Sequence, residues 1–144
     1  MKRLYISTLA IAAVILAGGV PRAWAAESSS LPPPDHAGGV TYLSGGVGSD
    51  QSAAMKQEMR NYPLVLEFAG HTSGGNDYLA DIPVQIVDAH GNAVLSTVTR
   101  GPFLLASLPD GHYSVTATYN GLSKRRSVNV HASSHVHEVF LWTM

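Results

Sequence analysis

The sequence predicts an all-β fold, a seven-stranded antiparallel β-sandwich with one short N-terminal helix. Short runs after Pro63 alternate between apolar and polar residues, which is typical of strands that bury one face. Glycine-containing turns separate these runs at close intervals, as in antiparallel sandwiches. Apolar residues just before Pro63 follow a helical spacing instead, which predicts the single helix.

The first 25 residues have the pattern of an export signal. Lys2 and Arg3 precede an apolar stretch over residues 4–20, and the small-residue motif that signal peptidase requires ends at Ala25. The stretch could alternatively stay as a membrane anchor, but glycines and Pro21 interrupt its end. We therefore expect a signal peptide, no transmembrane anchor after cleavage, and a periplasmic or secreted protein.

Composition excludes several classes of function. Cleavage would leave 119 of the 144 residues, which suits one domain with a modest core. The mature chain would carry six basic residues against ten acidic ones, a net charge of −4, so no nucleic-acid partner is expected. The chain contains no cysteine, which excludes disulfides, thiolate metal centres and cysteine nucleophiles.

Residues 26–48 form a leader rich in serine, proline and glycine, and we expect residues 26 to about 40 of it to be disordered or extended. The glycine segment Gly45–Gly48 lacks the Gly-Lys-Ser/Thr ending of a phosphate-binding loop. A turn before a helix is the simpler interpretation of these glycines.

Residues 49–62 predict the short helix. Ser49 or Asp50 can cap its start, and Pro63 ends it. Apolar residues spaced by four and three share one face of this helix: Met55, Met59 and Tyr62. The methionines could bind copper, but helical spacing favours packing of this face on the sheet.

Residues 63–144 are predicted to form the sandwich domain. We expect strands over residues 64–69, 82–87, 93–99, 103–106 and 113–119, a strand after Asn120-Gly121, and a last strand over 135–142. A loop rich in Gly, Asn and Asp is expected over 70–81.

The Asn-Gly pair at Asn120 predicts a type I′ hairpin, because both residues tolerate positive φ. The register that it sets places Tyr113 opposite Val128 on the apolar face. The same register places Lys124 and Arg126 on that face. Either a bulge shifts the pairing, or these side chains lie along the rim and stack on the tyrosines.

The run Leu108–Val115 combines a tight turn with the start of a strand. Pro109 fixes φ at the beginning of the turn, and Gly111 can adopt the positive φ that other residues resist. Tyr113 follows on the apolar face, so we expect a buried ring and a hydroxyl that reaches the backbone. We assign these residues a structural role and expect function elsewhere, at the histidine pair, the glycine segment or the sheet edges.

Four runs of the chain match a known pattern: Pro83–Asp88 with Gly91 in its turn, Gly101–Phe103, Leu108–Val115 and Ser127–Val130. With these runs, residues 64–142 resemble the carboxypeptidase regulatory-like domain, a prealbumin-like (Ig-like, transthyretin-like) β-sandwich. Such domains serve as accessory, adhesive or assembly modules, so the resemblance implies a fold more than a function. From Tyr42 onward the chain is also similar to small exported proteobacterial proteins with this domain, which implies that the helix belongs to the same unit.

The sequence does not support the enzymes of related shape. Hydroxyisourate hydrolases end in Tyr-Arg-Gly-Ser, whereas this chain ends in Leu141–Met144. Intradiol dioxygenases have Arg-Pro before a His-x-His pair, where this chain has Ala-Ser-Ser over 132–134. The carboxylates are scattered, and Glu67 and Glu138 are expected to face solvent.

His135 and His137 are the candidate metal ligands, because residues two apart on a strand point to the same side. Two imidazoles form an incomplete zinc or copper site, and an exposed polar pair near a strand end is the simpler alternative. Five other histidines could supply a third ligand: His36, His71, His90, His112 and His131.

Three functional hypotheses follow. The leading one is a non-enzymatic exported envelope module that binds a protein or a surface polymer through sheet edges or loops, with no cofactor. The second is a periplasmic copper- or zinc-binding protein that uses His135 and His137. The third is an enzyme with an unidentified site.

Overall fold

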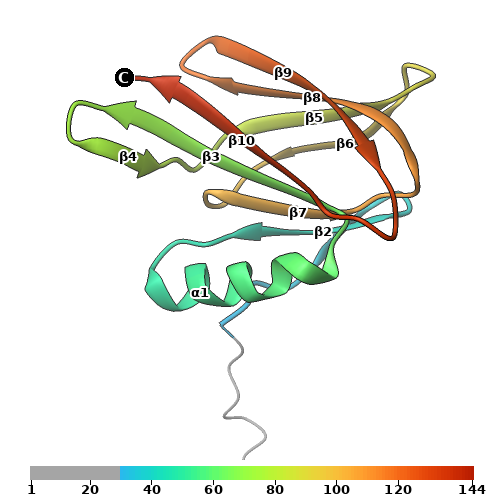
Figure 1. Ribbon diagram of the computed structural model, residues 1–144, viewed down its shortest axis with the longest axis horizontal. Coiled ribbons are helices and arrows are strands. Elements are labelled where there is room, and N and C mark those ends of the chain that lie inside the picture. The colour runs from blue at the N-terminus through green and yellow to red at the C-terminus, as the bar shows by residue number, and fades with distance from the viewer. Residues whose placement is uncertain (1–29) are drawn as a thin grey trace, which may run out of the picture.

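The computed structural model describes residues 30–144, which form two stacked β-sheets with a helix on the outside of one sheet (Figure 1). Sheet A has the strand order β1-β2-β7-β3-β10, with β4 paired to β3, and sheet B has the order β6-β5-β8-β9. The expected signal peptide, residues 1–25, lies outside the described residues. Within residues 30–144, no helix is long and apolar enough to cross a membrane.

The elements follow one another along the chain in a simple order. They are β1 Asp35–Ala37, β2 Val40–Gly45, α1 Ser49–Glu58, the 3₁₀ turn η2 Met59–Asn61, β3 Leu64–Thr72, β4 Gly75–Tyr78, β5 Pro83–Asp88, β6 Ala93–Val98, β7 Phe103–Ser107, β8 Gly111–Tyr119, β9 Leu122–Val130 and β10 Val136–Thr143.

The two-sheet, mostly β architecture agrees with the predicted sandwich, but the strand count does not. The described residues contain ten strands where seven were expected. The additional strands are β1, β2 and β4, and β4 lies within the expected loop over 70–81. The arrangement is also not purely antiparallel, because β10 runs parallel to β3, with Val136 opposite Leu64 and Thr143 opposite His71.

The described part of the predicted leader, residues 30–48, contains two strands of sheet A. β2 pairs with β7 inside sheet A, and β1 pairs with β2 at the sheet edge. Leu43 is buried on the helix side of the sheet, whereas Val40 belongs to the core between the sheets. Both faces of β2 are therefore covered, so this strand lacks the apolar and polar alternation that marks a half-exposed strand.

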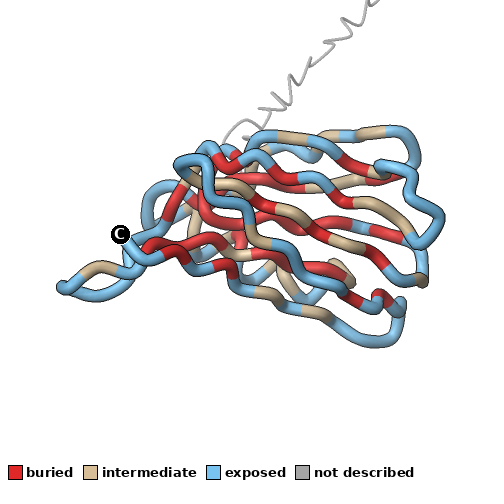
Figure 2. The backbone as a smooth tube through the Cα atoms, turned by 90° about the horizontal axis from the view of Figure 1, so that it is seen from above, coloured by how far each residue is buried: buried red, intermediate tan, exposed pale blue. Residues whose placement is uncertain are grey.

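The main core lies between the sheets. Figure 2 shows that the buried residues lie along the strands, whereas the turns are mostly exposed. Leu66, Ile86 and Val115 are fully buried in this core. At one end, Phe68, Phe140 and Trp142 stack with ring centroids 5.5 to 6.5 Å apart. Burial of this apolar surface is the dominant stabilising term for a chain without disulfides.

The helix α1 packs on the outer face of sheet A, as its apolar spacing predicted. Met55 is fully buried against residues of β2, β3 and β7, with Met59 and Tyr62 at the margin. The expected cap at Ser49 or Asp50 is wrong, because the N-cap is Gly48 and makes no side-chain hydrogen bond. Gln51 instead orders the entry to the helix, since its Oε1 accepts the Gly46 N–H at 2.7 Å.

The β8–β9 hairpin confirms the predicted turn and register. Asn120 and Gly121 have φ of 50° and 77°, and Tyr113 lies opposite Val128. The pairing continues without a bulge to Arg126, which lies opposite Val115. Of the two expected arrangements, the one without a bulge is therefore correct, and the Arg126 side chain stacks on an aromatic ring as expected. That ring is Phe140, with its centroid 5.4 Å from the guanidinium, rather than a tyrosine.

The turn before β8 is held by its tyrosine. Tyr113 is 7% exposed, and its hydroxyl donates a hydrogen bond to the Pro109 carbonyl at 2.8 Å. The expected positive φ of Gly111 is wrong, because this residue already begins β8 and pairs with Val130. Extended backbone at Gly111 leads directly into the strand.

Candidate functional site

A groove of about 600 Å³ lies between the open edges of the two sheets, on the side of β1 and β6. We call it the edge groove. Its lining residues come from the β1–β2 turn, the start of β6 and the turn before β8: Ala37, Gly38, Gly39, Val40, Asp88, Ala93, Val94, Leu95, Ser96, Pro109 and Tyr113. Most of these are apolar or lack a side chain, so the groove favours an apolar occupant.

The β1–β2 turn forms one wall of the edge groove, and its two glycines, Gly38 and Gly39, present only backbone atoms there. Gly38 has a φ of 60°, a left-handed conformation that glycine adopts without strain. A Cβ atom added at Gly38 or at Gly39 would meet no atom within 4 Å. The glycine pair therefore both permits the turn and keeps the space in front of it open.

Strand β6 forms the opposite wall and is the terminal strand of sheet B. Its pairing with β5 shifts between Ile86 and Val87, so that Leu95 pairs with Ile86, Ala93 pairs with Val87 and Val94 has no partner. Such a bulge redirects side chains, and bulges are frequent at sheet edges and next to functional sites. Here the bulged residue, Val94, lines the edge groove.

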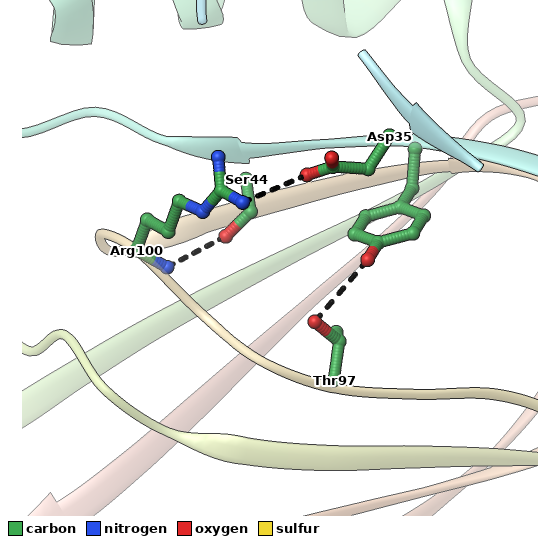
Figure 3. Close-up of polar contacts among 5 residues, drawn as sticks. Asp35, Ser44, Thr97 and Arg100 are labelled. Carbon is green, nitrogen blue, oxygen red and sulfur yellow. Dashed lines mark hydrogen bonds and ion pairs between the residues drawn. The ribbon is translucent and has the colours of Figure 1, made fainter. Parts of the chain in front are cut away.

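Polar contacts tie the two sheets together beyond one end of the edge groove (Figure 3). The Tyr42 hydroxyl donates to Thr97 Oγ1 at 3.3 Å, which links β2 to β6. The Arg100 backbone N–H donates to Ser44 Oγ at 2.7 Å, and its guanidinium lies 3.4 Å from the Asp35 carboxylate. These contacts link the two sheets on this side of the sandwich.

A carboxylate, Asp88, marks the other end of the edge groove. The backbone N–H groups of Asn92 and His90 both donate to its Oδ1 at 2.9 Å. The hydrogen bond from Asn92, and then that from His90, lower the pKa of Asp88 against an opposing effect of desolvation. Asp88 is therefore ionised at neutral pH.

Tyr113 contributes a ring wall and a neutral hydroxyl to the edge groove. Burial, and then the charges of Asp88 and Asp110, raise the pKa of its phenol. The hydroxyl therefore stays protonated, and its proton is directed at the Pro109 carbonyl. Neither Asp88 nor Tyr113 is placed as an activated base or nucleophile.

The predicted histidine pair lies on sheet A, away from the residues that line the edge groove. His135 precedes β10, and its Nδ1 is 3.0 Å from the Tyr62 carbonyl oxygen. His137 lies on β10, with its Nε2 3.0 Å from Glu67 Oε2. Each imidazole thus contacts a separate partner on the neighbouring segment.

Among residues 30–144, no group of three His, Cys, Asp or Glu side chains could hold a metal ion. The other candidate histidines have their own surroundings: His36 contacts Thr41, His71 contacts Asn76, and His90, His112 and His131 are exposed. None of them completes a site with His135 and His137.

Glu67 and Glu138 do not form a catalytic pair. Glu67 shares the outer face of sheet A with its partner His137, whereas Glu138 points toward the sandwich rim and contacts Arg126 at 3.9 Å. The expectation that both simply face solvent is incomplete, because each is partly buried beside a basic partner.

Sequence reasoning missed the edge groove and placed function away from Leu108–Val115, yet Pro109 and Tyr113 line this groove. The groove combines residues from three distant segments, and no local pattern records that combination. The available signal was Gly38-Gly39 followed by Val40 and Tyr42, which marks a tight turn into a strand.

No protein-family model matches the chain, and a search of curated proteins finds no match. The class that the structure itself defines is a two-sheet β-sandwich with an outer helix and a groove at one open edge.

Proposed function

We propose that the protein is a non-enzymatic exported module that binds an extended segment of a partner protein, which adds as a strand beside β6. The observation that carries this proposal is the unpaired edge of β6 next to an apolar groove. Strand addition obtains affinity from main-chain hydrogen bonds and specificity from pockets that take alternate side chains. The edge of β6 offers main-chain hydrogen-bonding groups, and the adjacent edge groove offers a pocket for side chains.

The other sheet edges are less suited to strand addition. β9 and β10 are joined across the sandwich, because Trp142 Nε1 donates to the Leu122 carbonyl at 3.0 Å and Arg126 pairs with Glu138. β1 comprises three residues and offers a short edge. β6 comprises six residues, and four of them line the groove.

The same proposal includes the carboxypeptidase regulatory-like, prealbumin-like assignment and a periplasmic or secreted location. The resemblance of residues 64–142 and the signal-like pattern of residues 1–25 support these parts. The protonated hydroxyl of Tyr113 and the backbone-bonded carboxylate of Asp88 support a binding role rather than a catalytic one.

Site-specific crosslinking tests the proposal. The chain without residues 1–25 is prepared with a photoreactive amino acid in place of Ser96, which is exposed and lines the groove. It is then irradiated with an extract of the producer's cell envelope. We expect a discrete adduct with one protein.

A matched pair of variants makes the crosslinking result specific. Gly39→Trp adds a large side chain to a residue that lines the edge groove, where a Cβ atom meets no atom within 4 Å. Gly74→Trp adds the same side chain in the β3–β4 turn, where the atom nearest to the Cβ is 3.9 Å away. The adduct should disappear with Gly39→Trp and persist with Gly74→Trp. An adduct insensitive to Gly39→Trp, or a chain that forms none and turns over a small molecule, would overturn the proposal.

A further inference from the structure

We propose that the segment bound beside β6 carries a lysine or arginine two positions from a large apolar residue, with the apolar side chain in the edge groove and the basic group on Asp88. This inference rests on the proposed function and names the sequence chemistry of the partner. It is carried by the shape of the groove and by an unpaired charge at its end.

The apolar half of the inference follows from the base of the edge groove. Val40, Leu95 and Tyr113 are 6%, 2% and 7% exposed, and they belong to the core between the sheets. An apolar side chain that enters the groove therefore packs directly on the core and removes its own surface from water. A volume of about 600 Å³ has room for a leucine, methionine or aromatic side chain.

The basic half of the inference follows from the charge on Asp88. Asp88 Oδ1 accepts the backbone N–H groups of His90 and Asn92, and the Asn92 side chain is a further hydrogen-bond partner, so the charge of this carboxylate is met mainly by neutral donors. Within residues 30–144, the ion pairs are Arg100–Asp35, Arg126–Glu138 and His137–Glu67, so Asp88 has none. The imidazole of His90, in the adjacent turn, is the nearby titratable group, and the charge of Asp110 also reaches Tyr113.

The spacing between the apolar residue and the basic residue of the partner follows from the β5–β6 register. Leu95 pairs with Ile86 and Ala93 pairs with Val87. Asp88 follows Val87 on β5, so it lies at the end of the groove marked by Ala93. Side chains two residues apart on a strand point to the same side. A strand whose apolar residue lies beside Leu95 therefore presents the residue two positions away near Ala93 and Asp88.

A displayed library of random peptides, each long enough to cover β6, tests this inference on the chain without residues 1–25. We expect enriched peptides to contain a large apolar residue with Lys or Arg two positions away. Enrichment should be lost on Gly39→Trp and kept on Gly74→Trp.

Charge variants then separate the basic requirement from strand addition itself. Asp88→Asn keeps an acceptor oxygen for the His90 and Asn92 N–H groups but removes the charge. We expect it to weaken an enriched peptide roughly fivefold at low salt, with a smaller effect at high salt. Asp77→Asn, an exposed change on β4, should leave the affinity unchanged.

The outcomes distinguish the inference from the proposed function. Peptides that depend on Gly39 but show no basic residue, or that bind Asp88→Asn as tightly as the parent, overturn the inference and leave strand addition standing. Peptides that bind Gly39→Trp equally well, or a library that yields no enrichment, overturn both.

Discussion

At the scale of single residues, Tyr113 joins the turn before β8 to the core. Its ring is buried between the sheets, and its hydroxyl donates to the carbonyl of Pro109, four residues earlier. The side chain thus fixes the position of one wall of the edge groove.

Tyr113→Phe should cost about 1 kcal/mol of unfolding free energy, because it removes one hydrogen bond and keeps the ring. Urea denaturation measures this loss. Tyr119→Phe is the control, since the Tyr119 hydroxyl makes no hydrogen bond within residues 30–144 while its ring packs on Trp142. Equal losses in the two variants would contradict the role assigned to the Tyr113 hydroxyl.

Asp88 makes the stability of the fold depend on pH. Hydrogen bonds from the Asn92 and His90 N–H groups lower its folded-state pKa, so the folded chain binds this proton less tightly than the unfolded chain. The contribution is fully present above the unfolded pKa and is lost as the pH falls through the folded pKa.

We therefore expect the urea midpoint of the parent to fall more steeply than that of Asp88→Asn as the pH drops through the acid range in which Asp88 becomes protonated. Asp77→Asn, an exposed change on β4, controls for the loss of one negative charge. Parallel profiles for Asp88→Asn and the parent would show that these backbone hydrogen bonds do not stabilise the folded carboxylate.

At the scale of elements, the close packing of the end of β2 against the segment before β7 requires a glycine at residue 101. A Cβ atom at Gly101 would lie 2.5 Å from the carbonyl carbon and oxygen of Gly45, at the end of β2. Backbone cannot yield as a flexible side chain can, so the segment before β7 approaches β2 only because residue 101 is glycine.

Gly101→Ala should destabilise the fold by about 1 to 3 kcal/mol, the usual cost of overpacking. Thermal or urea unfolding measures the loss. Gly39→Ala is the matched control, because its Cβ would meet no atom within 4 Å. A destabilisation at Gly39 as large as that at Gly101 would rule out close approach as the cause.

The strands that the sequence predicted well are those with one solvent-exposed face. β5 and β8 alternate between buried and more accessible positions, and so does the end of β9, so their periodicity is visible in the chain. β2 is covered on both faces and lies in a segment rich in glycine, which hid it. β4 is exposed throughout, so it shows no apolar face in the sequence, and it is held by its pairing with β3 and by the packing of Tyr78 on Phe103.

The candidate site was less predictable than the strands. Tyr113 and Pro109 were recognised as structural residues from local turn chemistry, and both also line the edge groove. The groove depends on β1 and β6 lying at the same side of the sandwich. That arrangement is a property of the topology rather than of any short segment.

At the scale of the whole molecule, the segment before residue 63 completes the fold. α1 covers apolar side chains on the outer face of sheet A, including Val65, Phe103 and Leu105, and β2 extends that sheet by pairing with β7. A fragment of residues 63–144, the domain expected from sequence, should therefore lack cooperative unfolding and a dispersed amide NMR spectrum. A well-dispersed spectrum from that fragment would show that β2 and α1 are dispensable additions.

The parallel pairing of β3 with β10 also determines when the chain can fold. The two strands stand at opposite ends of the segment that builds the sandwich, and the aromatic stack of Phe68, Phe140 and Trp142 joins them. A nascent chain that has not yet released residues 136–143 leaves one side of β3 unpaired and Phe68 without its stacking partners. Folding of sheet A therefore requires residues 136–143, and such long-range closure makes it slow.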